Sequence, residues 1–124
     1  MTQPENSPTA DTLAHLTERV RAFTAARNWE QFHSPKNLVM ALCGEVGELT
    51  EHFQWKSEEQ SRTLEPSTIG EVSKELADVL IYLVRLADVL GIDLPAAAHA
   101  KIDLNEKRYP VELSRGSSKK YNEL

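Results

Sequence analysis

Two pairs of carboxylates stand at helical spacing in this chain, about thirty residues apart. Glu45 and Glu48 form the first pair, and Glu75 and Asp78 form the second. Residues three apart lie on the same face of an α-helix, so each pair presents two carboxylates one turn apart. Hard oxygen ligands suit Mg²⁺, which proteins bind through carboxylates together with substrate phosphates. The four acids therefore predict a divalent-metal site for a polyphosphate, provided that the two helices pack together.

Solvated surface charge is the alternative interpretation of each pair taken alone, because most acids on helices are exposed. On a helical wheel, however, both pairs border an apolar arc instead of facing away from it. Four carboxylates so close together are destabilising without a cation, which favours a metal site over a purely structural cluster. One glutamate left free of metal would be available as a general base, and Glu45 and Glu48 are the candidates.

The ligand types favour Mg²⁺, with Mn²⁺ as a substitute. Di-iron helical bundles use a glutamate followed by a histidine three residues later, and here His52 stands four residues after Glu48. Zinc sites rich in thiolate or imidazole ligands are likewise unsupported, since both pairs offer only carboxylates. Glu51 and Glu71 are further acids nearby, but we do not expect either of them to be a primary ligand.

Apolar residues recur at helical spacing in four stretches, which predicts an all-α fold, a four-helix bundle. Thr9 or Asp11 can cap the first helix, and Ser34 can cap the second. Thr68 with Glu71 has the form of a capping box for the third helix, which Gly91 ends. The expected helices cover residues 13–27, 35–55, 68–90 and 94–108, and residues 56–66 form a polar loop.

A chain of 124 residues is long enough for one domain around one core. We expect a flexible arm over residues 1–8, a helical domain over 9–110, and a basic tail over 111–124 that is disordered or folds over a ligand. The third helix is apolar on nearly every side, which predicts that a second face is buried. A homo-oligomer is the simplest reason for that burial.

Composition limits the classes of partner. The formal net charge of −5 argues against a general binder of nucleic-acid polymers or of membrane surfaces, both of which need basic footprints. Cys43 is the single cysteine and cannot form an intramolecular disulfide, which fits a reducing compartment. There is no leader-like segment and no run of 18 apolar residues, so we expect a cytoplasmic protein.

Several longer motifs resemble the all-α, MazG-like nucleotide pyrophosphohydrolases. They are a Trp-x-x-Phe-His pattern at residues 29–33, the stretch 44–56 that ends in Phe53-Gln54-Trp55-Lys56, the stretch 75–83, and a tail with Asn105, Arg108-Tyr109-Pro110 and residues 117–121. The resemblance covers residues 13–124, and within the family it is greatest to members that act on dCTP. The polar loop of residues 56–66 departs from the pattern, which leaves any substrate contact from it in doubt.

The resemblance implies roles for the matching residues. It implies Mg²⁺ ligation by Glu45, Glu48, Glu75 and Asp78, contacts to the base and sugar by Trp29, His33, Trp55 and Tyr82, and contacts to the nucleotide or its phosphates by Asn105, Lys119 and Tyr121. Some of these residues also have structural alternatives: core packing for Trp29, Phe32 and Tyr82, a loop position for His33, and solvated tail charges for Lys119 and Lys120.

The implied reaction is hydrolysis of dCTP, or of a 5-modified dCTP, to the monophosphate and pyrophosphate, by a dimer or homotetramer. The substrate would be a small-molecule nucleoside triphosphate, and the role would be sanitation of the nucleotide pool. Two alternatives stay open at this point. One is a broader dNTP or dUTP pyrophosphohydrolase of the same fold, and the other is a non-catalytic helical oligomer that binds nucleotide.

Overall fold

The computed structural model describes residues 12–124 and divides them into two compact units, one up to Gly91 and one from Ile92 to Leu124. These residues are helical or irregular and contain no strand. None of their helices is both long and apolar enough to cross a membrane. The first unit contains α1 (Leu13–Ala26), the 3₁₀ helix η2 (Glu30–Phe32), α2 (Pro35–Glu51), α3 (Glu58–Arg62) and α4 (Pro66–Leu90).

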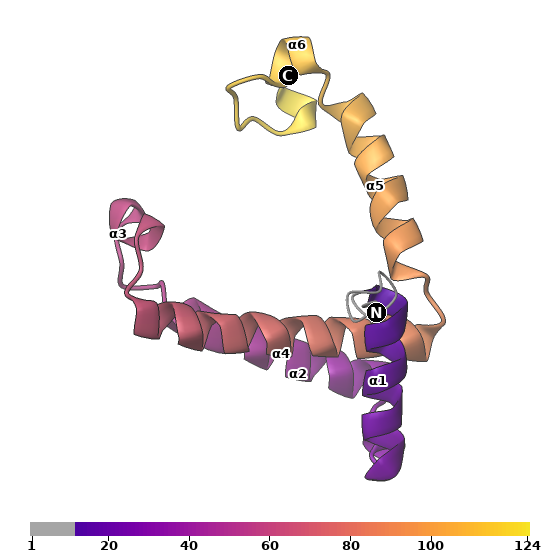
Figure 1. The fold of residues 1–124 in the computed structure, drawn as a ribbon. Helices are drawn as coiled ribbons and strands as arrows, with labels where there is room; N and C mark the ends of the chain where they lie inside the picture. Colours follow the sequence, from indigo (N-terminus) through magenta and orange to yellow (C-terminus); the bar gives the residue numbers. More distant parts are fainter. Residues whose placement is uncertain (1–11) are drawn as a thin grey trace, which may run out of the picture. The chain divides into compact units, whose positions relative to one another are not determined.

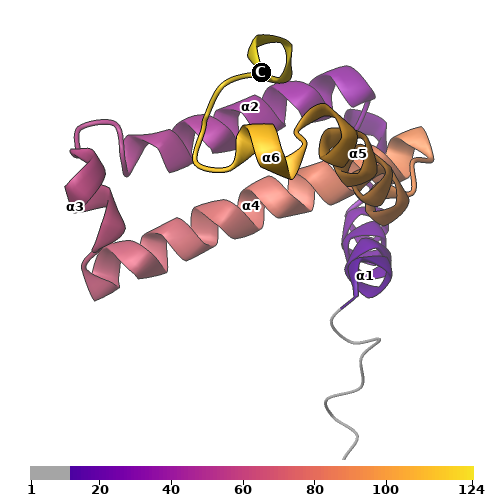
Figure 2. The same ribbon diagram turned by 90° about the horizontal axis from the view of Figure 1, so that it is seen from above.

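The first unit is built on an antiparallel pair of long helices. Figures 1 and 2 show α2 and α4 side by side, with α3 joining them at one end of the pair. Helix α1 packs against α4 near the other end of the pair. The buried apolar side chains are few, and they come from α2 and α4: Leu38, Val72, Val84 and Ala87. Leu38 is 1% exposed and is the buried apolar residue that α2 contributes, whereas α4 contributes the other three.

Local signals set several helix ends as the sequence predicts. Ser34 caps α2 by accepting a hydrogen bond from the Asn37 amide, and Pro35 occupies the first turn. Gly91 ends α4 in the left-handed region, at φ 68°, where glycine avoids a steric penalty. Asp93 caps the next helix through the Ala96 amide. The predicted caps Thr9 and Asp11, and the predicted arm of residues 1–8, lie outside the described residues.

Two predicted boundaries are wrong. Helix α4 begins at Pro66, so Thr68 lies inside its first turn and does not form the predicted capping box. The residue before a proline favours extended backbone, and Glu65 adopts it, with ψ 148°. Helix α2 ends at Glu51 instead of Trp55, because the amides of His52 and Phe53 donate to carbonyls three residues back instead of four.

The connector between α2 and α4 is not an irregular loop. Its middle forms α3, which begins with a capping box: the Ser57 hydroxyl accepts from the Gln60 amide, and the Gln60 side chain accepts from the Ser57 amide. Arg62 pairs with Glu59 on the surface of this short helix. The connector therefore holds the ends of the helix pair at a defined spacing.

The second unit contains α5 (Leu94–Arg108), α6 (Val111–Ser114) and the 3₁₀ helix η3 (Tyr121–Glu123). Its last residues fold back on the end of α5. The Arg108 guanidinium lies 4.5 Å from the centre of the Tyr121 ring, and Tyr109 meets the same ring edge to face. All four predicted helices are thus present as α1, α2, α4 and α5, with α3 and α6 in addition.

Candidate active site

The acidic pairs of α2 and α4 face each other across the helix pair. Glu45, Glu48 and Glu75 each place one carboxylate oxygen within 4.8 Å of the others. Asp78 lies one turn after Glu75 and is close enough to act electrostatically on Glu45. The antiparallel packing of α2 on α4 thus joins residues thirty positions apart, and the predicted metal ligands are gathered on one face of the first unit.

The cluster raises the pKa of the Glu45 carboxyl. A proton shared with Glu48 raises the pKa of the Glu45 carboxyl, burial raises it further, and so do the negative charges of Glu48, Asp78 and Glu75; the resulting value is about 7. The Oε2 atom of Glu45 is buried without a hydrogen-bond partner among residues 12–124. An acceptor in this position is costly unless a proton or a cation satisfies it.

This donor set fits a hard divalent cation. Its atoms are carboxylate oxygens, which suit Mg²⁺ and Mn²⁺ better than the softer ions that thiolates select. His52 stands beside the cluster, with its Nε2 atom 4.0 Å from Oε1 of Glu75. A cation bound between α2 and α4 would relieve the repulsion and satisfy the buried Glu45 oxygen.

A hollow of about 450 Å³ begins at His52 and continues to the α3 connector. It is lined by Glu51, His52, Trp55, Lys56, Gln60, Thr63 and Glu65. Trp55 is 88% exposed, so its ring has no packing role and is free to meet a ligand. Because His52 lines the hollow and also lies beside Glu75, the hollow begins next to the acidic cluster.

The predicted contacts to the base and sugar are not all gathered in one place within a single chain. Trp29 and His33 precede α2, and Trp55 follows it, while the 17 residues of the helix span about 26 Å. Trp29 packs edge to face on Phe23 of α1, with ring centres 5.7 Å apart. Tyr82 is half-buried on α4, one turn after Asp78.

The remaining predicted residues lie in the second unit. Asn105 is half-buried near the end of α5, and Lys119 is exposed in the segment before η3. Tyr121 is held by Arg108 and Tyr109, as described above. The tail of residues 111–124 therefore has ordered structure of its own, and its role toward a nucleotide stays a prediction.

Sequence reasoning overlooked residues of the hollow and of a polar network. Gln60 and Thr63 line the hollow but fall within the predicted polar loop, although the spacing of Ser57 and Gln60 is a readable capping signal. Arg85 and Asp88 form hydrogen bonds with residues more than fifty positions away, and no local pattern indicates such contacts.

Comparison with known proteins identifies the family of this chain. Residues 40–124 match the model of the MazG-like family. The chain belongs to the MazG-like family. It is 50% identical to a rat protein named dCTP pyrophosphatase 1, over 91% of this chain and 68% of the rat protein. A human protein of the same name is 49% identical over the same shares.

A solved structure supports the fold independently. A crystallised pyrophosphatase from Archaeoglobus fulgidus superposes with a TM-score of 0.75 and 40% sequence identity, covering 79% of this chain and 92% of that one. The predicted family and the all-helical MazG-like fold are therefore confirmed, and this MazG-like chain is similar to pyrophosphatases over most of its length.

Proposed function

We propose that this MazG-like protein hydrolyses dCTP to dCMP and pyrophosphate. The observation that carries the proposal is the convergence of Glu45, Glu48 and Glu75 in a chain about half identical to proteins named dCTP pyrophosphatase. A carboxylate cluster that needs a cation and adjoins a hollow with an exposed tryptophan suits a nucleotide: the phosphates would meet the cation and the base would stack on the ring.

Mg²⁺ is the proposed ion, and Glu45, Glu48, Glu75 and Asp78 would hold it. When bound, it would neutralise charge on the phosphate oxygens and activate water for in-line attack. Glu45 and Glu48 are also the proposed catalytic residues, because whichever of them is free of the ion is placed to accept a proton from water.

The nucleoside is assigned to the hollow beside the cluster. Trp55 would supply a stacking face, and Lys56 a positive charge at the rim. Tyr82 lies on the same helix as the acids, and a ring against the sugar would disfavour a ribose 2′-hydroxyl by crowding. Asn105, Lys119 and Tyr121 of the second unit are proposed to contact the nucleotide or its phosphates.

We also infer that the protein acts as a homo-oligomer, a dimer or tetramer, in the cytoplasm. Large apolar side chains of the first unit are exposed in the single chain, including Met40 at 64% and Leu76 at 53%. Exposed apolar surface on this scale is typical of an interface. A second copy would also supply a Trp29 and a His33 to a nucleotide held by the first, since α2 separates these residues from Trp55 within one chain. Sedimentation of the purified protein as a monomer would contradict this inference.

The decisive test is release of pyrophosphate from dCTP with and without Mg²⁺. Asp78→Asn removes one carboxylate charge and keeps the side-chain shape, so we expect turnover to fall at least about a hundredfold, the size of losses at catalytic electrostatic groups. Glu71→Gln is the matched control: it removes an exposed charge from the same helix and should keep activity. Full activity in Asp78→Asn, with an unchanged helical circular dichroism spectrum, would contradict the metal-site assignment.

A panel of triphosphates assayed side by side separates the alternatives. Preference for dCTP or a 5-modified dCTP supports the proposal, whereas comparable turnover of dUTP and other dNTPs indicates a broader enzyme. Nucleotide binding without any turnover, which persists after the acids are neutralised, would indicate a non-catalytic binding protein.

A further inference from the structure

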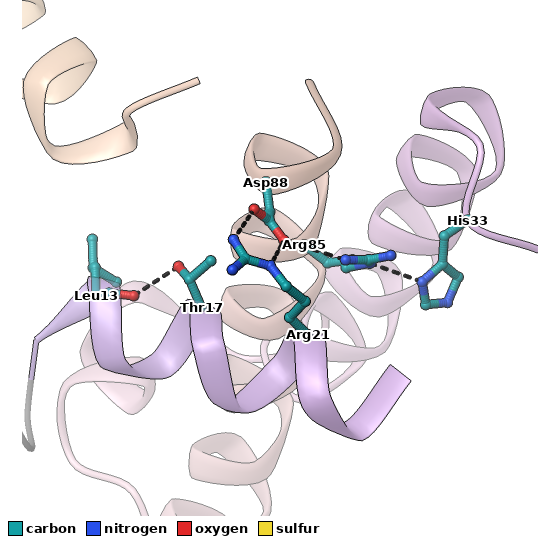
Figure 3. Close-up of polar contacts among 6 residues, drawn as sticks. All are labelled: Leu13, Thr17, Arg21, His33, Arg85 and Asp88. Carbon is teal, nitrogen blue, oxygen red and sulfur yellow. Dashed lines mark hydrogen bonds and ion pairs between the residues drawn. The ribbon is translucent and has the colours of Figure 1, made fainter. Parts of the chain in front are cut away.

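A chain of charged and polar side chains connects three helical elements at the end of the helix pair opposite α3. Arg21 of α1 donates two hydrogen bonds to Asp88 of α4, at 3.0 and 2.6 Å. Asp88 also accepts from Nη1 of Arg85, one turn earlier, at 3.3 Å. Arg85 then donates from its Nε atom to Nδ1 of His33, at 3.0 Å (Figure 3). Figure 3 shows the side chains in this order, with His33 approaching from the segment before α2.

The hydrogen bond from Arg85 to His33 determines which imidazole nitrogen carries the proton. An arginine side chain has only donors and keeps its charge, so Nδ1 of His33 must be the acceptor and must lack a proton. A neutral imidazole with a bare Nδ1 carries its hydrogen on Nε2. No described residue within 12–124 hydrogen-bonds to Nε2, so this N–H is available to a ligand.

Burial makes the arrangement persistent. Arg85 is 8% exposed, and its guanidinium donates to the Asp88 carboxylate. A second positive charge on His33 would face Arg85 at hydrogen-bond distance. Burial and the charge of Arg85 accordingly lower the pKa of His33, in that order, while Glu30 of η2 opposes them weakly. The lowered pKa and the contact with Arg85 both favour the neutral form of His33.

We propose that Arg85 is a positioning residue that holds His33 as the neutral tautomer protonated on Nε2, so that His33 donates one hydrogen bond to the nucleotide. A neutral donor suits a carbonyl or sugar oxygen better than it suits a phosphate charge, so His33 contributes to recognition of the nucleoside. This inference rests on the proposed function, since it takes His33 to contact the substrate. Arg85 acts through His33 and does not itself touch the nucleotide.

The tautomer is measured directly by ¹⁵N NMR of the histidine side chains in the full-length protein, without turnover. In the wild type at pH 7.5, we expect the Nδ1 resonance of His33 to be that of a bare nitrogen and the Nε2 resonance that of a protonated one. Arg85→Met removes the donor and should give a mixture of tautomers with a higher pKa. Arg85→Lys, which keeps a donor and a charge, should retain the wild-type tautomer at least in part.

Kinetics test whether the tautomer matters for binding. With dCTP at pH 8, we expect Arg85→Met to raise KM by the inverse of the fraction of His33 that keeps its proton on Nε2, about twofold for an even mixture, with kcat little changed. At pH 6 the variant's imidazole takes up a second proton and regains an N–H on Nε2. The ratio of variant to wild-type KM should therefore fall toward one between pH 8 and pH 6.

Controls separate this inference from structural damage and from the proposed function. Lys74→Met removes an exposed cation from the same helix and should change neither the His33 resonances nor the KM. A His33 protonated on Nδ1 in the wild type, or a tautomer unaffected by Arg85→Met, would overturn the proposal, and so would a KM ratio that is the same at both pH values. If Arg85→Met does not fold, the wild-type spectrum still decides, because a proton on Nδ1 of His33 would overturn the proposal. Failure of the wild type to hydrolyse dCTP refutes the proposed function while leaving the tautomer result intact.

Discussion

Replacing Glu45 by glutamine should stabilise the metal-free protein while abolishing its response to Mg²⁺. In the folded chain the Glu45 carboxylate faces the negative charges of Glu48, Glu75 and Asp78 with one buried oxygen unpaired. Glutamine has the shape of the protonated acid, and its amide can donate to Glu48 without adding charge. The variant therefore removes the repulsion and also removes one ligand of the proposed ion.

The size of the effect follows from the pKa of Glu45. The difference between an ordinary value of 4.5 and one of about 7 corresponds to at most about 3 kcal/mol at pH 8. Solvent screening of these partly exposed carboxylates reduces the expected gain in the free energy of unfolding to about 1–2 kcal/mol. For a chain of this length, that gain raises Tm by roughly 5 °C.

The pH dependence has a definite sign. The folded state raises the pKa of Glu45, so it binds a proton more tightly than the unfolded chain does. Without metal, the stability contributed by this proton is fully present below about pH 4.5 and is lost as pH rises through about 7. The Glu45→Gln variant lacks the titrating group, so its advantage over the wild type should be largest at pH 8 and small at pH 5.

Thermal unfolding at pH 5 and pH 8, with and without Mg²⁺, checks all three expectations. At a Mg²⁺ concentration about 100 times its Kd, the wild type should gain about 2.7 kcal/mol, whereas the variant should gain much less. Glu71→Gln again serves as the control, with the wild-type response. The reasoning is refuted if metal-free Glu45→Gln is less stable than the wild type at pH 8, or if Mg²⁺ stabilises both equally.

Two further substitutions probe the rest of the structure. Asp88→Asn should lower the free energy of unfolding by about 2 kcal/mol at pH 7, because it leaves the buried Arg85 charge without its carboxylate. The hydrogen bonds from Arg21 lower the pKa of Asp88, so this contribution is present above about pH 4 and is lost as pH falls through the lowered pKa. Urea titrations at decreasing pH should therefore show the two proteins converging. Trp55→Ala should leave Tm nearly unchanged, since the ring is 88% exposed, but should raise KM for dCTP about tenfold or more through lost stacking. An unchanged KM would remove Trp55 from the nucleotide site.

Local sequence signals predicted most of the helices because their causes lie within a few residues. Ser34 with Pro35, Gly91, and Asp93 each act on the backbone of their own turn. The start of α4 was placed too late, since Thr68 and Glu71 imitate a capping box while the Glu65–Pro66 step upstream already sets helical backbone. Helix α3 was missed because five residues are too few for a recognisable apolar period.

The acidic site was predictable in part for a similar reason. The spacing within each pair places its two carboxylates on one helix face, and the apolar arc beside each pair determines which face packs. The spatial relation among the aromatic residues was not predictable in this way. The family resemblance groups Trp29, His33 and Trp55 around one nucleoside. Within a single chain, however, the length of α2 separates Trp29 and His33 from Trp55.

The sequence by itself determined an all-helical chain with two acid pairs, because helix periodicity and capping are local properties of the backbone and its side chains. Only the tertiary structure decided that Glu75 meets Glu45 and Glu48, that a hollow opens beside His52, and that Arg85 meets His33. These contacts join residues far apart in the chain, and they depend on how helices pack. Helix packing is decided by the whole apolar surface at once, which no single motif specifies.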